Sequence, residues 1–226
     1  MERETFIHPS GKRESEVDIN EVRGLGSGTF GWVREAVVSK GNVKRTMALK
    51  HFFKGREQAQ SAFDNYKLAK KAGLKVFTTY RISKEGDAIL MTNGNDKETV
   101  CLSLSPKEDR PKALDGESIE KIENFDELLQ NLYQEAEKAT KNGLYFNGDE
   151  IFFLVDKKTK TKVSFVLGDM DGISVDPMRF EGVPYDNIAE VGASVVVFLD
   201  KYMSPEVSEA YAQKVREFFS HKKQSA

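Results

Sequence analysis

The sequence predicts an α+β fold of two small lobes, in which antiparallel strands and one helix precede a part made mainly of helices. Three features support this prediction: a glycine-rich turn between two strand-like segments, a long amphipathic helix pattern in the second half, and a short hairpin that leads into Gly-Asp-Met-Asp. A chain of 226 residues can bury one good core or two small lobes. We expect the first lobe at about 17–93, a linker at about 94–116 and a reduced helical lobe at about 117–222.

Composition limits the classes of protein to which the chain can belong. The net charge of −2 gives no reason to expect nucleic acid or a membrane surface as a partner. Cys101 is the single cysteine, so disulfides within the chain are excluded and a reducing compartment is expected. The longest apolar run, Val195 to Leu199, is too short to span a bilayer, and the charged start does not look like a signal peptide. Residues 1–16 are polar and broken by Pro9, which predicts a flexible tail.

Three glycines near the amino terminus form a phosphate-binding pattern. Gly26, Gly28 and Gly31 match G-x-G-x-x-G-x-V, a spacing that two kinds of fold use. In a dinucleotide-binding fold the glycines open a helix, whereas in a protein kinase they form a hairpin turn over the ATP phosphates. The segment 32–38 is rich in β-branched and aromatic residues without helical periodicity, which predicts a strand and therefore the hairpin. The residues expected to bind the nucleotide here are Leu25, Gly26, Ser27, Gly28, Thr29, Gly31 and Val33.

The next predicted strand, 45–52, carries a lysine that fits the same interpretation. Its Met-Ala-Leu-Lys is similar to the V-A-I-K of protein kinases, in which Ala48 would pack on adenine and Lys50 would hold the α- and β-phosphates. A helix is predicted next, from its apolar spacing and from the glycine that ends it. A kinase needs one acid from this helix to position the lysine. Asp64 lies in about the right turn and Glu57 nearer the helix start, and either could instead be an ordinary solvated side chain.

Two further strands, 76–82 and 87–92, are predicted to complete the first sheet. In the kinase interpretation they lead to the hinge, where Met91 would lie behind the adenine. The backbone around Thr92 and Asn93 would then bond the edge of the base. The stretch that follows is rich in proline and charge and has no periodicity, which predicts the irregular linker.

The second half of the sequence has the patterns of several helices around a short β-hairpin. A long amphipathic helix is expected from about 117 to 142, and strands at 151–155 and 161–167 follow it. The second strand runs into Asp169 and Asp171. In a kinase the Asp that follows this hairpin binds Mg²⁺, so Asp169 is the expected metal ligand and Asp171 an auxiliary one. Two more helices are expected, at 187–202 and at about 204–220.

The catalytic loop departs from the kinase pattern H-R-D-x-x-x-x-N. If Asp149 occupies the place of the Asn, Leu144 falls where the catalytic base should be. If Asp149 is itself the acid near the substrate hydroxyl, Asn147 or Glu150 is left to contact the metal. Both alternatives stay open, and Asp149 is a candidate both for catalysis and for metal binding. The expected catalytic residues are Lys50, Asp149 and Asp169.

From about Val17 to Phe219 the chain resembles a pared-down protein kinase, and its G-S-G-T-F-G loop and G-D-M-D motif are most similar to the HopBF family of bacterial type III effectors. The resemblance implies a minimal protein serine/threonine kinase that uses ATP and Mg²⁺ (or Mn²⁺) and is secreted into the host cell cytoplasm. It also implies a target, the eukaryotic ninety-kilodalton heat-shock chaperone, whose phosphorylation would suppress host immunity. We further expect a monomer. The matching residues are Gly26, Gly28, Gly31, Val33, Ala48, Lys50 and Asp169.

Two other functions are alternatives. Antibiotic and sugar kinases share this lobe order, although they usually carry a recognisable H-G-D-x-x-x-x-N loop and a larger substrate lobe. A nucleotide-binding pseudokinase that acts only as a scaffold would explain the altered catalytic loop. The presence of Lys50 and Asp169 argues against the pseudokinase.

Overall fold

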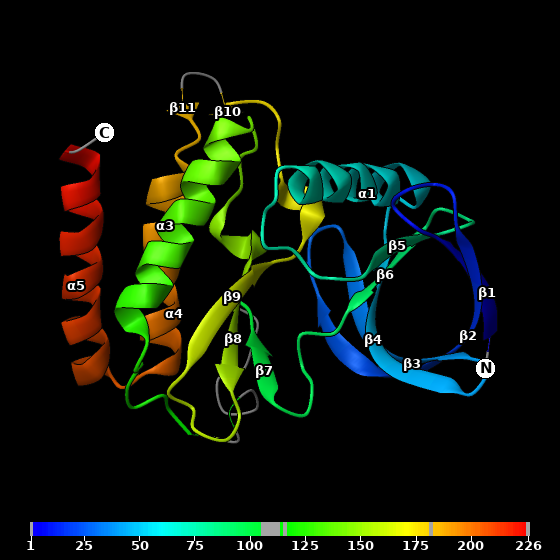
Figure 1. Cartoon of the computed structure of the whole chain (residues 1–226), viewed down its shortest axis with the longest axis horizontal. Coiled ribbons are helices and arrows are strands. Elements are labelled where there is room, and N and C mark those ends of the chain that lie inside the picture. Colours follow the sequence, from blue (N-terminus) through cyan, green and yellow to red (C-terminus); the bar gives the residue numbers. More distant parts are fainter. Residues whose placement is uncertain (1, 105–113, 115–116, 181–182, 225–226) are drawn as a thin grey trace.

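The computed structural model describes residues 2–104, 114, 117–180 and 183–224, which form a mixed fold of α-helices and antiparallel sheets (Figure 1). A closed barrel of strands, with helix α1 (Arg56–Lys71) lying along it, forms one side of the molecule. A three-stranded sheet and three helices form the other side. These helices are α3 (Phe125–Lys141), α4 (Asn187–Tyr202) and α5 (Pro205–Gln224).

The barrel strands follow the order β1-β2-β3-β4-β6-β5, and each is antiparallel to its neighbours. Apolar side chains fill the interior, among them Phe6, Ile19, Leu49 and Leu90. Closure leaves the sheet without a long unpaired edge, which stabilises it against pairing with other chains. The strands are β1 (Glu2–Ile7), β2 (Glu14–Ser27), β3 (Gly31–Lys40), β4 (Val43–Phe52), β5 (Tyr80–Ser83) and β6 (Ala88–Thr92).

Strand β1 corrects the prediction that residues 1–16 form a flexible tail. It pairs with β2 from Glu2↔Ile19 to Ile7↔Glu14, and its end also pairs with β5. The Phe6 side chain is fully buried in the barrel. A polar segment can therefore be ordered here because the backbone hydrogen bonds of two neighbouring strands and one buried aromatic ring hold it.

Strand β4 places its side chains alternately on two faces. Met47 and Leu49 point into the barrel core, whereas Ala48 and Phe52 join the larger core that includes α1. Because successive strand residues point to opposite sides, Lys50 lies on the same face as Ala48 and Phe52. This alternation directs the lysine out of the barrel and toward the second half of the chain.

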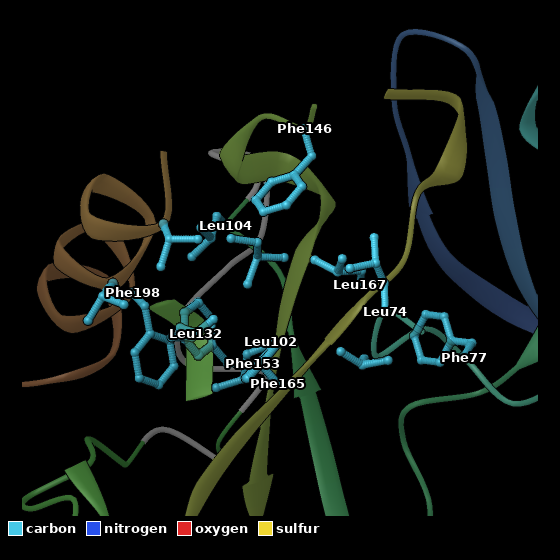
Figure 2. Packing of buried hydrophobic residues seen from close by; sticks show 14 of the residues in the cluster. Leu74, Phe77, Leu102, Leu104, Leu132, Phe146, Phe153, Phe165, Leu167 and Phe198 are labelled. Atoms are coloured by element: carbon cyan, nitrogen blue, oxygen red, sulfur yellow. The ribbon is translucent and has the colours of Figure 1, made fainter. Parts of the chain in front are cut away.

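The second sheet has the order β7-β8-β9, with β7 (Thr99–Leu102), β8 (Ile151–Asp156) and β9 (Val163–Leu167). Figure 2 shows the apolar side chains that pack on it. Phe153 of β8 stacks on Phe198 of α4, with ring centroids 4.1 Å apart. Such aromatic pairs add to the burial of apolar area that joins sheet and helices. Short elements complete this part: η1 (Gly148–Glu150), η2 (Met170–Gly172), β10 (Met178–Phe180) and β11 (Val183–Pro184).

Three predicted boundaries were wrong. The helix expected from about 117 to 142 is α3, which begins only at Phe125, and Ile119 instead forms an isolated parallel bridge with Met203. The expected linker at 94–116 contains strand β7, which pairs with β8, and most of its remainder lies outside the described residues. The strand predicted at 76–82 is β5 at Tyr80–Ser83, while Val76 forms an isolated parallel bridge with Leu167 of β9. All three differences involve pairing between segments far apart in the sequence, which local composition does not reveal.

Gly31 provides a test of the barrel geometry. A Cβ at this position would overlap the backbone carbonyl of His51 on the paired strand β4, so we expect Gly31→Ala to lower the free energy of unfolding by about 2 kcal/mol. Gly28→Ala is the matched control, because a Cβ there would meet nothing within 4 Å. Urea unfolding should show a change below about 0.5 kcal/mol for the control. Equal midpoints for the two variants would contradict the close approach.

Candidate nucleotide site

The glycine pattern forms a hairpin turn between two strands, as the sequence predicts. Ser27 at the end of β2 pairs with Trp32 at the start of β3, and the Gly28 amide donates to the Gly31 carbonyl at 2.9 Å. A Cβ on Gly26 or Gly28 would meet no atom within 4 Å, whereas Gly31 is confined by β4. The three glycines therefore differ. Gly31 is required by strand packing, and Gly26 and Gly28 leave their backbone open to a ligand.

The residues predicted to contact adenine lie on neighbouring strands. Val33 pairs with Lys50 across β3 and β4, and Ala48 pairs with Met91 across β4 and β6. Leu25 and Val33 are partly buried and pack against the core that contains Ala48 and Met91. An apolar surface of this kind, next to an uncovered glycine backbone, is suited to a flat aromatic base.

The hinge residues are only partly as predicted. The Thr92 amide donates to the Thr79 carbonyl at 3.0 Å and is not available to a base, and the bond expected from the backbone around Thr92 and Asn93 stays a prediction. The Asn93 side chain is buried and joins two segments of the chain. Its amide donates to Glu35 at 3.2 Å, and its oxygen accepts from the Asn95 backbone amide at 3.0 Å. The Asn93 side chain therefore shapes the hinge.

Lys50 is held by two carboxylates. Its side chain is 6% exposed, and Nζ donates to Oδ1 of Asp169 and, at 2.6 Å, to Oδ1 of Asp171. Burial alone would lower the pKa of Lys50, but the two neighbouring carboxylates outweigh it and raise the pKa above its usual value. The ammonium therefore stays charged in a buried position.

The two aspartates differ in their environment. The Asp169 side chain is 40% exposed, whereas that of Asp171 is 7% exposed. Burial and then the charge of Asp169 raise the pKa of Asp171 to about 6, while Lys50 outweighs burial and lowers the pKa of Asp169. Asp171 Oδ2 is buried and has no hydrogen-bond partner among the described residues. Asp169 also adopts a left-handed backbone with φ of 39°, a costly conformation that is often found at functional sites.

The prediction that an acid of helix α1 pairs with Lys50 was wrong. Asp64 forms its ion pair with Lys67 at 2.5 Å and accepts from Gln60, on the outer side of α1, and Glu57 is exposed. The buried stripe of α1 passes through Ala62, Phe63, Tyr66 and Ala69, and one residue along a helix turns the side chain by about 100°. Asp64 consequently points away from the site.

Asn65 is the residue that α1 directs at the site, and sequence reasoning missed it. Its Nδ2 donates to the carbonyls of Met170 at 2.9 Å and Ile173 at 2.8 Å. These bonds fix the turn that carries Asp169 and Asp171 against the helix. No motif in the sequence signalled this role, because it depends on a contact over more than 100 residues of chain.

The loop before β8 brings Glu150 to the same turn. The Glu150 side chain is buried, and its Oε2 accepts from the Asn147 amide at 2.5 Å. A Cβ on Gly172 would overlap its carboxyl group, so Glu150 packs directly against the Asp169–Gly172 turn. Burial, with smaller contributions from the charges of Asp169 and Asp149, raises the pKa of Glu150 to about 8.

The remaining residues of that loop have different surroundings. Asp149 is exposed, and its side chain has no hydrogen bond or ion pair with the rest of the described chain. Leu144 is buried, and its carbonyl accepts from Asn187 at 2.8 Å, so no titratable group stands at that position. Asn147 Oδ1 is buried and lacks a partner within the described residues. Asp149 is thus the acid of this loop that is exposed to solvent, whereas Glu150 is buried.

Gly168, which precedes the acidic turn, packs between two rings. A Cβ there would meet Phe77 and Phe152 at 2.7 Å, so only a glycine allows this approach. Phe152 lies on the partly exposed face of β8 and was not predicted to contact this turn. The strand alternation of β8 could have identified this face.

Two absences apply to the described residues only. No group of three or more His, Cys, Asp and Glu side chains gathers there as it would around a metal ion. None of the helices in the described ranges is long and apolar enough to cross a membrane.

Comparison with known proteins shows the class of fold. Neither a protein-family model nor a curated protein matches the chain. Among solved structures, the chain is similar to "ROP18 kinase domain in complex with AMP-PNP and sucrose", with a TM-score of 0.50 and 15% sequence identity. The similarity covers 91% of this chain and 70% of that chain. The chain therefore has a kinase-like fold.

Asn65→Ala tests the attachment of the acidic turn to α1. The variant leaves two carbonyls without their donor, so we expect the free energy of unfolding to fall by about 1–3 kcal/mol and amide exchange at 170–173 to accelerate. Gln60→Ala on the exposed face of the same helix is the control, with an expected change below about 0.5 kcal/mol. Unaltered exchange at the turn would show that Asn65 does not hold it.

Proposed function

We propose that the chain is an ATP- and Mg²⁺-dependent protein serine/threonine kinase with a minimal, two-lobed catalytic domain. The observation that carries the proposal is the buried Lys50 ammonium, held by Asp169 and Asp171 on the strand that pairs with the end of the glycine hairpin. The kinase-like fold supports the same conclusion.

The residues around the hairpin would bind ATP. Gly26 and Gly28 would let the phosphates approach the hairpin backbone closely, since no side chain covers them. Lys50 would neutralise the α- and β-phosphates. The residues proposed to enclose the base and hairpin are Leu25, Ser27, Thr29, Val33, Ala48, Met91 and the Asn93 backbone.

The charges of the site fit a divalent cation. Asp169 and Asp171 carry two negative charges against one positive charge on Lys50, and the Asp169 carboxylate is partly exposed. Mg²⁺ is commonly bound by one or two carboxylates together with substrate phosphates and water. Asp169 would hold the metal, which would neutralise charge on the transferring phosphoryl group.

Asp149 is the proposed acid near the substrate hydroxyl. Since burial raises the pKa of Glu150 to about 8, Glu150 is mainly protonated at neutral pH and is poorly suited to accept a proton. Asp149 is exposed at the same loop and can be approached. The substrate oxygen would attack the γ-phosphorus, the bond from that phosphorus to the β-phosphate oxygen would break, and the hydroxyl proton would pass to Asp149 or to solvent.

The proposed target and setting come from the resemblance to the HopBF effectors. The G-S-G-T-F-G and G-D-M-D motifs support a secreted bacterial kinase that phosphorylates the ninety-kilodalton heat-shock chaperone in the host cytoplasm. This part of the proposal stands on sequence similarity alone, and its test is separate from the test for kinase activity.

Transfer of labelled γ-phosphate from Mg-ATP to the purified chaperone tests both parts. We expect incorporation that falls at least about a hundredfold in Asp169→Asn, because a metal-binding carboxylate is removed. Glu209→Gln, an exposed acid paired with Arg216 on α5, should match the unaltered protein.

The other outcomes separate the remaining functions. Autophosphorylation without transfer to the chaperone would retain the kinase and reject the target. Nucleotide binding without any transfer, to protein or to small-molecule acceptors, would indicate a pseudokinase scaffold.

A further inference from the structure

We propose that Asp171 is the positioning residue for Lys50, in the role that an acid from helix α1 would otherwise fill. The inference rests on the proposed function, and it assigns the two aspartates of the turn to different tasks. Asp169 would hold the metal at the phosphates, and Asp171 would keep the lysine in place.

The geometry around Lys50 supports this division. Asp171 Oδ1 lies 2.6 Å from Nζ, and its side chain is 7% exposed beside a lysine that is 6% exposed. The pair is therefore shielded from solvent, where a charge-assisted hydrogen bond is strong and geometrically restrictive. Asp169 contacts the same ammonium, but its side chain is 40% exposed and accessible to a cation.

Helix α1 provides no competing acid. Its two acidic residues are Asp64, paired with Lys67, and Glu57, which is exposed. The helix instead presents Asn65, which donates to two carbonyls that flank Asp171 in the chain, those of Met170 and Ile173. Helix α1 thus acts on Lys50 indirectly, because it fixes the turn that carries Asp171.

This arrangement makes the lysine partner and the metal ligand parts of one turn. When ATP and metal bind, Asp169 would exchange Lys50 for the cation, while Asp171 would stay on Lys50 and hold it toward the phosphates. The Lys50 position would therefore not require a movement of α1 that brings an acid into the site. Glu150 packs against this turn at Gly172.

The alternative role for Asp171 is that of a second metal ligand through its unpartnered Oδ2. The two roles differ in whether the effect of changing Asp171 depends on the presence of Lys50. A residue that positions Lys50 loses its effect when Lys50 is removed, whereas an independent metal ligand retains it. A metal ligand also changes the Mg²⁺ concentration that half-saturates the reaction.

A double-mutant cycle with Lys50→Met, Asp171→Asn and the combined variant tests the inference. Each single change should reduce kcat/KM for ATP at least about tenfold, and the combined variant should be no worse than Lys50→Met alone. Half-saturation by Mg²⁺ should be unchanged in Asp171→Asn and raised in Asp169→Asn. Where turnover is too slow to measure, the same cycle is read from the affinity for a fluorescent ATP analogue.

Adenosine binding is the control for folding. Adenosine lacks phosphates, so Asp171→Asn should lower the affinity for the ATP analogue and leave the affinity for adenosine within about twofold. Loss of both affinities would indicate a merely structural role for Asp171 and would overturn the inference. If the losses in kcat/KM of the two single variants multiply in the combined variant, or if Asp171→Asn requires more Mg²⁺, Asp171 is a metal ligand. Either result would also overturn the inference. An unaltered protein that neither transfers phosphate nor binds ATP would instead reject the proposed function.

Discussion

The buried ammonium of Lys50 is the interaction on which the rest of the site depends. An isolated charge is costly to remove from water, so a buried lysine is stable only with nearby carboxylates. Asp169 and Asp171 supply them from a turn that follows β9, more than 100 residues later in the chain. The same contact therefore compensates the charge and ties the barrel to the second sheet. Asn65 strengthens this connection by joining α1 to the turn.

The barrel supplies the rigidity that such a contact needs. Strand β1 pairs with both β2 and β5 and so closes the barrel. The tight approach of Gly31 to β4 fixes the hairpin that contains Gly26 and Gly28. A rigid strand pair beside an open backbone gives a preorganised surface, so little ordering is required when phosphates bind. The short second part, with a three-stranded sheet and its helices, carries the acidic turn that contacts Lys50.

The sequence predicts the local parts of this arrangement and fails where long-range contacts decide. The glycine hairpin, the strand with Lys50 and the hairpin before Asp169 follow from periodicity and turn chemistry over about ten residues. The helix acid could not be predicted, because a shift of one position on α1 exchanges Asp64 for Asn65 and the choice depends on how the helix packs. Strand β1 was missed for a similar reason, since its order comes from pairing with β2 and β5.

The most direct measurement is a crystal structure of the chain with Mg²⁺ and a non-hydrolysable ATP analogue. The account predicts the triphosphate under the Gly26–Gly28 backbone, Lys50 on its α- and β-phosphates, Asp169 on the metal and Asp171 still hydrogen-bonded to Lys50. A nucleotide bound elsewhere, or a site in which Lys50 keeps both aspartates and contacts no phosphate, would contradict the central claim.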